Sequence, residues 1–193
     1  MAVNITIFVS GNGTNCEQII KHFANTSKIN VGLVISNRPD AYALVRAKKH
    51  NVPSIVFNKT EINTKEILLP VLKKFNTDFI VLAGFLLMIP NYVIDAFPKK
   101  IINLHPALLP KFGGKGMYGH HVHEAVKAAG ERQTGFTVHY VSPECDGGPI
   151  IEQFSVDIDP TDTVSDIARK ENLLELEHFP CVIERVIQST FNN

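Results

Sequence analysis

The chain has 193 residues, 45% hydrophobic and 20% charged, which is enough apolar material for one buried core and excludes a disordered or fibrous chain. Basic and acidic residues both total 19, a balance that argues against a general nucleic-acid or membrane-surface binder. Because the three cysteines (Cys16, Cys145 and Cys181) are too few and too scattered for a disulfide framework, and no apolar run could span a bilayer, we expect a cytoplasmic protein without nucleic-acid or membrane partners.

Strands and helices alternate along the first half of the sequence. Runs rich in apolar and β-branched residues at 4–9, 31–35, 53–57, 79–83 and 101–104 predict five strands. Apolar residues at helical spacing predict helices at 16–24, 41–50, 67–75 and 92–96, with Pro70 marking a kink or an early turn. Apolar strands joined by helices indicate a parallel sheet that is covered on both faces.

The second half of the sequence mixes predicted helices and strands with a glycine-rich segment. The segment 110–119 holds four glycines and predicts a flexible loop. A helix at 120–129, strands at 134–141 and 150–158, and a terminal helix that kinks at Pro180 are expected to follow. We therefore predict a single α/β domain over 1–193, with a mostly parallel Rossmann-like sheet and antiparallel strands in its C-terminal part.

A glycine-rich turn, SGNGTN at 10–15, separates the first strand from the first helix. Glycines let backbone N–H groups face an anion, and the helix N-terminus adds positive potential, so the turn predicts a phosphate cradle. An ordinary tight turn is the alternative. A dinucleotide site is disfavoured, because Cys16 replaces the third glycine of that fingerprint and no acidic residue follows the second strand.

Two further motifs suggest chemistry. Asn103 and His105 stand two apart at a strand end, so both side chains point the same way and could bind an oxyanion and manage a proton. Asp146 precedes Gly147 and Gly148 in a long loop and could orient His105 or raise its pKa. The structural alternatives are a turn cap with a buried histidine, and a hairpin turn. We interpret the three histidines His120, His121 and His123 as the start of a helix rather than as a metal-binding cluster.

Four motifs together carry a resemblance: SGNGTN (10–15), LAGFLLMI (82–89), INLHPALLPKF (102–112) and DGGPII (146–151). From residue 5 to about 187 the sequence resembles the folate-dependent phosphoribosylglycinamide formyltransferase family. The resemblance implies transfer of the formyl group of 10-formyltetrahydrofolate, a co-substrate, to the amine of 5-phosphoribosylglycinamide in purine biosynthesis. It implies direct attack through a tetrahedral intermediate, with Asn103 and a protonated His105 on the oxyanion, no metal, and a monomer or homodimer.

The resemblance also assigns residues. The catalytic group would be Asn103, His105 and Asp146, supported by His139. The phosphate and ribose contacts would be Gly13, Thr14, Asn15, Asn172, Leu173, Leu174 and Glu175. The folate pocket would comprise Leu86, Leu87, Met88, Ile89, Asn103, Ser142, Pro143, Glu144, Cys145 and Asp146. We expect a phosphate-binding half at 1–102 and a catalytic and folate-binding half at 103–193.

The sequence departs from the family at three places. Some relatives carry Arg where this chain has Leu87, and a second folate-contacting Arg has at best Lys65 as its counterpart. The loop 113–121 is longer than the form found in some relatives.

The sequence is also compatible with other activities. The alternatives are formyltetrahydrofolate hydrolase, methionyl-tRNA formyltransferase, a non-catalytic folate- or phosphate-binding module and a dinucleotide oxidoreductase. The tRNA enzyme would have a further C-terminal domain and a basic surface, and the hydrolase an N-terminal regulatory domain, neither of which we expect here.

Overall fold

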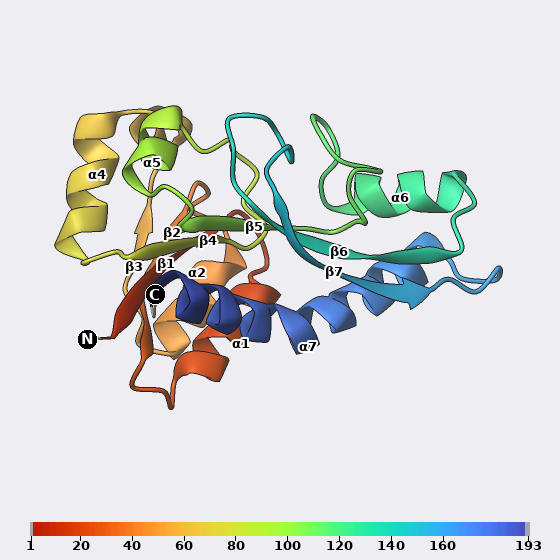
Figure 1. Cartoon of the computed structure of the whole chain (residues 1–193), viewed down its shortest axis with the longest axis horizontal. Helices are drawn as coiled ribbons and strands as arrows, with labels where there is room; N and C mark the ends of the chain where they lie inside the picture. The colour runs from red at the N-terminus through yellow and green to blue at the C-terminus, as the bar shows by residue number, and fades with distance from the viewer. Residues whose placement is uncertain (1, 192–193) are drawn as a thin grey trace.

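The computed structural model describes residues 2–191, and its centre is a seven-stranded sheet in the order β3-β2-β1-β4-β5-β6-β7 (Figure 1). The strands are β1 (Val3–Val9), β2 (Ile29–Ser36), β3 (Ser54–Val56), β4 (Phe79–Leu82), β5 (Ile101–His105), β6 (Gln133–Tyr140) and β7 (Ile150–Asp157). The first five strands pair in parallel, and β6 and β7 add to the sheet antiparallel. The predicted fold class is confirmed.

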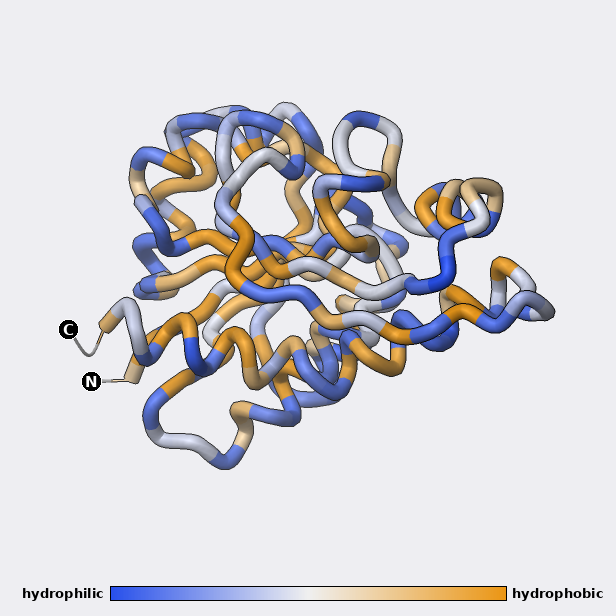
Figure 2. Tube along the Cα trace, turned by 45° about the vertical axis from the view of Figure 1, so that its right-hand side comes forward, coloured by the Kyte–Doolittle hydropathy of each residue, from blue (hydrophilic) through white to orange (hydrophobic). Residues whose placement is uncertain are grey.

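Helices cover both faces of the sheet. They are α1 (Thr14–Phe23), α2 (Tyr42–Lys49), α3 (Lys59–Ile62), α4 (Lys65–Lys74), α5 (Asn91–Ala96), α6 (His120–Ala128) and α7 (Val164–Phe191). Side chains alternate across β1, so Ile5, Ile7 and Val9 pack with α1, α2 and α7, whereas Phe8 joins the core under α3, α4 and α5. In Figure 2 the helices alternate between orange and blue along their lengths, as half-buried helices do.

Some elements differ from the prediction. The short helix α3 was not predicted, although Asn58 and Glu61 form a reciprocal capping box whose N-x-x-E spacing is visible in the sequence. Helix α7 continues through Pro180, and Pro70 is the sixth residue of α4 rather than part of its first turn. Over residues 2–191, no helix combines the length and the apolar character needed to cross a membrane.

The order of the strands decides where a ligand can enter. Strand β1 lies between β2 and β4, so the chain runs toward opposite edges of the sheet after β1 and after β3. At such a switch point the loops beyond the carboxyl ends of the strands separate and leave a crevice. Two hydrogen bonds join the loops beyond β1 and β4: Ser10 N–H donates to the Gly84 carbonyl at 3.0 Å, and Leu86 N–H donates to Ser10 Oγ at 2.8 Å.

Candidate active site

A cavity of about 810 Å³ opens beyond the carboxyl ends of β1, β4 and β5. Its wall comes from segments that are far apart in the sequence: 10–15, 82–89, 103–106 and 114–119, parts of 139–146, and single residues of other elements, namely Arg38, His123, Asn172 and Glu175. The crevice that the strand order predicts is therefore a real cavity, and it contains both motifs that suggested chemistry.

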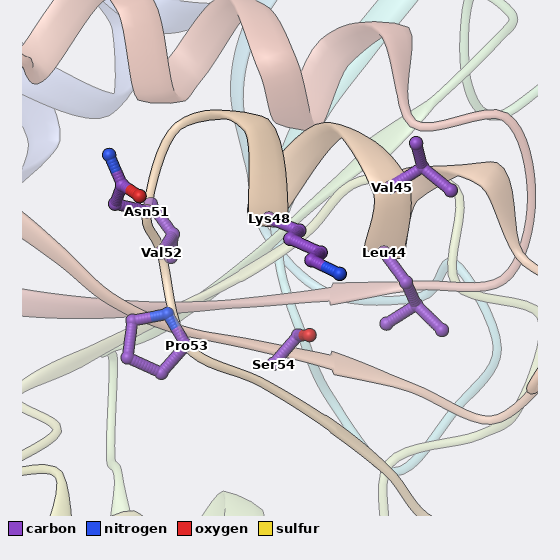
Figure 3. Close-up of a pocket in the computed structure, with 7 residues that line it drawn as sticks. All are labelled: Leu44, Val45, Lys48, Asn51, Val52, Pro53 and Ser54. Carbon is purple, nitrogen blue, oxygen red and sulfur yellow. The ribbon is translucent and has the colours of Figure 1, made fainter.

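A second depression, about 520 Å³, lies between α2 and β3 (Figure 3). Its lining residues are Leu44, Val45, Lys48, Asn51, Val52, Pro53 and Ser54. Lys48 is the single ionisable side chain in this lining, so no acid and base meet there. The cavity at the strand ends is the better candidate for catalysis.

The predicted catalytic residues converge in that cavity. His105 Nδ1 lies 3.5 Å from Asp146 Oδ2, although the two residues are 41 positions apart in the printed sequence. Asn103 stands opposite His139 in the β5–β6 pairing, and its Nδ2 lies 3.1 Å from His139 Nε2. His139 Nε2 is in turn 3.6 Å from Asp146 Oδ1. The amide, two imidazoles and a carboxylate thus form one connected group at the cavity wall.

The surroundings of His105 favour its neutral form in the free protein. Its side chain is almost completely buried, and burial lowers the pKa of His105 below the ordinary value of 6.5. Asp146 and the Phe112 carbonyl oxygen, which is 2.8 Å from Nε2, oppose that shift but do not overcome it. Loss of solvation outweighs the nearby carboxylate, so the ring is neutral in the free protein at neutral pH, and the protonated His105 expected on the oxyanion stays a prediction for the reacting complex.

Asp146 is held in an unusual backbone conformation. Its φ is +54°, in the left-handed region, and its Oδ2 accepts a hydrogen bond from Gly114 N–H at 2.9 Å. Burial raises the pKa of Asp146, but His139, the Gly114 N–H and His105 lower it by more, so that it stays below the usual value. The carboxyl group is therefore ionised at neutral pH.

The glycines after Asp146 act through close packing rather than through left-handed backbone angles. A Cβ on Gly148 would lie 1.7 Å from the Tyr140 carbonyl oxygen, and one on Gly147 would lie 2.8 Å from Glu144 Cβ. No larger residue fits at Gly148 without moving the backbone, so the glycine fixes how the Asp146 loop folds back on β6.

The glycine-rich turn has the form of an anion-binding loop. Gly13 is the N-cap of α1 with φ at +73°, and Gly13, Thr14 and Asn15 all line the cavity. Over the described part of the chain, no protein group accepts a hydrogen bond from the N–H of Gly11, Asn12 or Gly13. Free N–H groups at a helix N-terminus are the arrangement that favours a phosphate.

The far side of this loop is formed by α7. Glu175 Oε2 accepts hydrogen bonds from Asn15 Nδ2 at 2.7 Å and from Asn172 Nδ2 at 3.1 Å. Burial raises the pKa of Glu175 even though Glu171, Asn15 and Asn172 donate to it. Burial and the adjacent Glu175 raise the pKa of Glu171 well above its usual value.

Two residues assigned to the ribonucleotide do not reach the cavity. Leu173 is 57% exposed to solvent, and Leu174 packs against the core of the sheet, whereas Asn172 and Glu175 line the cavity. Successive helical residues point about 100° apart, so a continuous segment 172–175 cannot present every side chain to one ligand. Leu173 and Leu174 lie outside the cavity lining, and their assignment to the ribonucleotide stays a prediction.

The expected folate segments occupy another part of the same cavity. Leu86, Leu87, Met88 and Ile89 line it, as do Ser142, Glu144, Cys145 and Asp146. Pro143 is absent from the lining, and so is Lys65, which begins α4. Leu86 and Met88 are half-exposed, an unusual position for apolar side chains that suits a flat aromatic ligand.

Several lining residues were not predicted as site residues. Arg38, directly after β2, could have been found from its place at a strand end, and Lys115, Met117 and Tyr118 belong to the loop after β5. His123 is buried, faces the cavity and has an Nδ1 without a partner. His120 and His121 instead pair with Glu124 on the surface. Among residues 2–191, no group of three potential ligands could hold a metal ion.

Comparison with known proteins agrees with this geometry. The family model described as formyl transferase matches residues 3–183. The chloroplastic phosphoribosylglycinamide formyltransferase of Arabidopsis thaliana is 39% identical over 180 residues, which are 90% of this chain and 61% of that protein. The phosphoribosylglycinamide formyltransferase of Bacillus subtilis is 33% identical over 186 residues, covering 94% and 93% of the two chains.

The same similarity is found among solved structures. The crystal structure of phosphoribosylglycinamide formyltransferase from Anaplasma phagocytophilum has a TM-score of 0.89 at 30% identity, covering 98% of this chain and 88% of that one. The chain spans about three fifths of the length of the plant relatives, whose matched shares are 61% and 57%.

Proposed function

The chain belongs to the formyl transferase family, and we propose that it transfers the formyl group of 10-formyltetrahydrofolate to the amine of 5-phosphoribosylglycinamide. Members of the family use formyltetrahydrofolate as co-substrate. The relatives named above carry this activity in their names, and the cavity has a place for each part of the reaction. The product would be the formylated ribonucleotide, and the step belongs to purine biosynthesis.

One observation carries the proposal: the phosphate-binding turn and the Asn103–His105–Asp146 group share one cavity. An anion bound at Gly13 would fix one end of the ribonucleotide, and its amine would then extend toward His105. The apolar segment 86–89 supports a place for the pteridine ring on the other side. Positioning two reactants side by side removes much of the entropic barrier to their reaction.

The proposed chemistry needs one proton to change places. The amine nitrogen attacks the formyl carbon, a C–N bond forms, and the carbonyl oxygen becomes an oxyanion to which the Asn103 amide donates a hydrogen bond. Neutral His105 takes a proton from the attacking nitrogen, and the Asp146 carboxylate stabilises the resulting imidazolium. That proton passes to N10 of the folate as the C–N10 bond breaks, which leaves tetrahydrofolate.

The remaining assignments follow from this mechanism. The oxyanion is assigned to hydrogen-bond donors rather than to a metal ion, and activity after dialysis against a chelator tests that assignment. We place the enzyme in the cytoplasm, because its cysteines, Cys16, Cys145 and Cys181, are all unpaired, which is typical of reducing compartments. We further propose that the enzyme is a monomer or homodimer that acts on these two small molecules.

A spectrophotometric assay tests the activity. The protein is mixed with 10-formyltetrahydrofolate, and consumption of the folate is followed before and after 5-phosphoribosylglycinamide is added. Consumption that begins when the ribonucleotide is added supports the transferase. Consumption without it would identify a hydrolase, and binding of both ligands without turnover would identify a non-catalytic module.

Replacing His105 with Ala, or Asp146 with Asn, should lower kcat by at least ~100-fold, the typical loss when a positioned acid–base or oxyanion group is removed. His121→Ala serves as the matched control, because this histidine is exposed and lies outside the cavity lining. The folded state is checked by circular dichroism. A variant with unchanged kcat would remove its residue from the mechanism.

A further inference from the structure

Three successive carbonyl oxygens of the glycine-rich turn accept hydrogen bonds from residues outside the cavity lining. The Gly11 carbonyl accepts from Ala43 N–H at 3.2 Å, the Asn12 carbonyl from Arg46 Nε at 2.9 Å, and the Gly13 carbonyl from Glu17 N–H at 2.9 Å. Because these three carbonyl oxygens are held by partners behind the turn, the free N–H groups between them face the cavity. The anion-binding form of the turn thus depends on partners behind it.

Helix α2 supplies two of these three partners. It lies beside α1 on the same face of the sheet (Figure 1). A Cβ on Gly13 would lie 2.4 Å from Ala43 Cβ, so the turn is in close contact with α2. Gly11 and Gly13 are therefore held by the α2 backbone and by packing, whereas the central Asn12 carbonyl is held by a side chain, that of Arg46.

Arg46 is itself fixed from several directions. Its Nη1 donates to Glu17 Oε2 and its Nη2 to Asn12 Oδ1 at 3.3 Å, and its guanidinium carbon lies 4.9 Å from the centre of the Tyr42 ring. The Arg46 side chain is 21% exposed and that of Glu17 is 11% exposed. A planar guanidinium can donate several hydrogen bonds in this forked arrangement, whereas a lysine ammonium cannot.

The neighbours of Glu17 keep its carboxyl group ionised. The hydrogen bond with His50 lowers the pKa of Glu17 against the effect of burial, and Arg46 and Lys21 lower it further. Glu17 therefore stays ionised and remains a partner for Arg46 at neutral pH. Neither Glu17 nor Arg46 lines the cavity, so neither touches a ligand there.

From these contacts we propose that Arg46 is a positioning residue for the phosphate of the substrate: clamped by Glu17, it holds the Asn12 carbonyl away from the cavity and so keeps the turn in its anion-binding form. The proposal rests on the proposed function in one respect, the assignment of the turn at 10–15 to the ribonucleotide phosphate.

Steady-state kinetics separate positioning from a general structural role. Arg46→Met keeps the apolar stem and removes every donor, and we expect the KM for 5-phosphoribosylglycinamide to rise about tenfold or more, as remote misplacement of a binding group does. The KM for 10-formyltetrahydrofolate and kcat should change less than about twofold. Arg169→Met is the control, because that arginine pairs with Asp166 on the exposed surface.

Two further variants identify how Arg46 acts. Arg46→Lys keeps the charge but loses the fork, so the KM for the ribonucleotide should still rise; full recovery with lysine would show a charge effect and overturn the proposal. Glu17→Gln should raise the same KM by a smaller factor. Because Glu17 acts on the turn through Arg46, adding Glu17→Gln to Arg46→Met should cause no further rise. If Arg46→Met does not fold, the lysine and glutamine variants carry the test.

A direct binding measurement makes the proposal independent of turnover. Ribose 5-phosphate is titrated into wild-type protein and each variant by calorimetry, and we expect Arg46→Met to weaken its binding about tenfold or more. Formyl transfer with unchanged ribonucleotide KM in Arg46→Met would overturn this proposal and leave the proposed function standing. Wild-type protein that binds ribose 5-phosphate through Arg46 but transfers no formyl group would refute the proposed function alone.

Discussion

His105 is surrounded by hydrogen-bond acceptors. Nε2 faces the Phe112 carbonyl at 2.8 Å and Nδ1 faces Asp146 at 3.5 Å, an arrangement that suits a doubly protonated ring. Burial nevertheless keeps the pKa of His105 below its ordinary value. The protein thus holds a neutral imidazole in a site built for the cation, and the cation forms when the reaction supplies a proton.

A histidine titration followed by NMR measures this balance. We expect the His105 ring signal, identified by its loss in His105→Ala, to titrate below pH 6.5, since desolvation disfavours the charged ring. In Asp146→Asn the midpoint should fall further, because the carboxylate that favours the cation is gone. A wild-type midpoint above 6.5 would show that Asp146 outweighs burial.

Glu171 and Glu175 are a second case in which burial and charge compete. Both are buried one helical turn apart, and Glu171 Oε1 has no hydrogen-bond partner. Because the folded-state pKa of Glu171 lies above its unfolded value of 4.5, folding takes up a proton, and stability should fall as the pH rises above about 4.5.

Glu171→Gln should therefore stabilise the protein at neutral and alkaline pH. We expect the melting temperature to rise by at least about 2 °C at pH 8, and the difference from wild type to shrink toward pH 5. Thermal unfolding between pH 5 and pH 8 measures it, with Glu177→Gln on the exposed face of the same helix as control. A constant difference across that range would mean that Glu171 does not titrate.

At the scale of an element, the β6–β7 connection positions Asp146. The connection is closed by Tyr140 N–H donating to the Pro149 carbonyl at 2.9 Å, and Gly148 packs against the Tyr140 carbonyl. The loop from β5 is tied to the same place, since Gly114 donates to Asp146 and the Phe112 carbonyl meets His105. Two loops thus fix the geometry of one acid–base pair.

Gly148→Ala tests whether this loop matters for catalysis. The new Cβ would displace the backbone around Asp146, so kcat should fall by at least about tenfold although the side chain has no chemistry of its own. In Gly32→Ala the nearest atom is 3.7 Å away, and that variant should keep wild-type kcat. Equal activity in both variants would show that the loop adapts.

At the scale of the whole molecule, one cavity collects residues from both ends of the sequence. Asn15 near the N-terminus bonds Glu175 on α7, and residues 86–89 line the same cavity as residues 142–146. The expected division at residue 102 into a phosphate-binding half and a catalytic and folate-binding half stays a prediction. The cavity itself draws its wall from both sides of that boundary.

Ligand binding should therefore stabilise the entire fold. At a concentration of 100 times Kd, either 5-phosphoribosylglycinamide or tetrahydrofolate should raise the free energy of unfolding by about 2.7 kcal/mol. This corresponds to a rise of roughly 5–10 °C in melting temperature. The two together should give about the sum. Differential scanning fluorimetry measures it with NAD as control, and a shift with NAD alone would favour the dinucleotide-binding alternative.

The sequence by itself determined the fold class, because strand and helix periodicities report which side chains are buried. It also located the SGNGTN turn, Asn103, His105 and Asp146, since glycine spacing and strand ends are local features. It missed α3, whose four residues bury too little apolar surface to form a periodic pattern.

Tertiary structure decided the rest, because those properties depend on groups distant along the chain. Desolvation of His105 comes from the whole surrounding wall, so its lowered pKa could not be predicted from a neighbouring carboxylate. Which residues of 172–175 reach the cavity depends on how α7 is rotated against the sheet. The bond from Arg46 to the Asn12 carbonyl joins α2 to the turn before α1, across 34 residues of sequence, a contact that packing creates and no local pattern encodes.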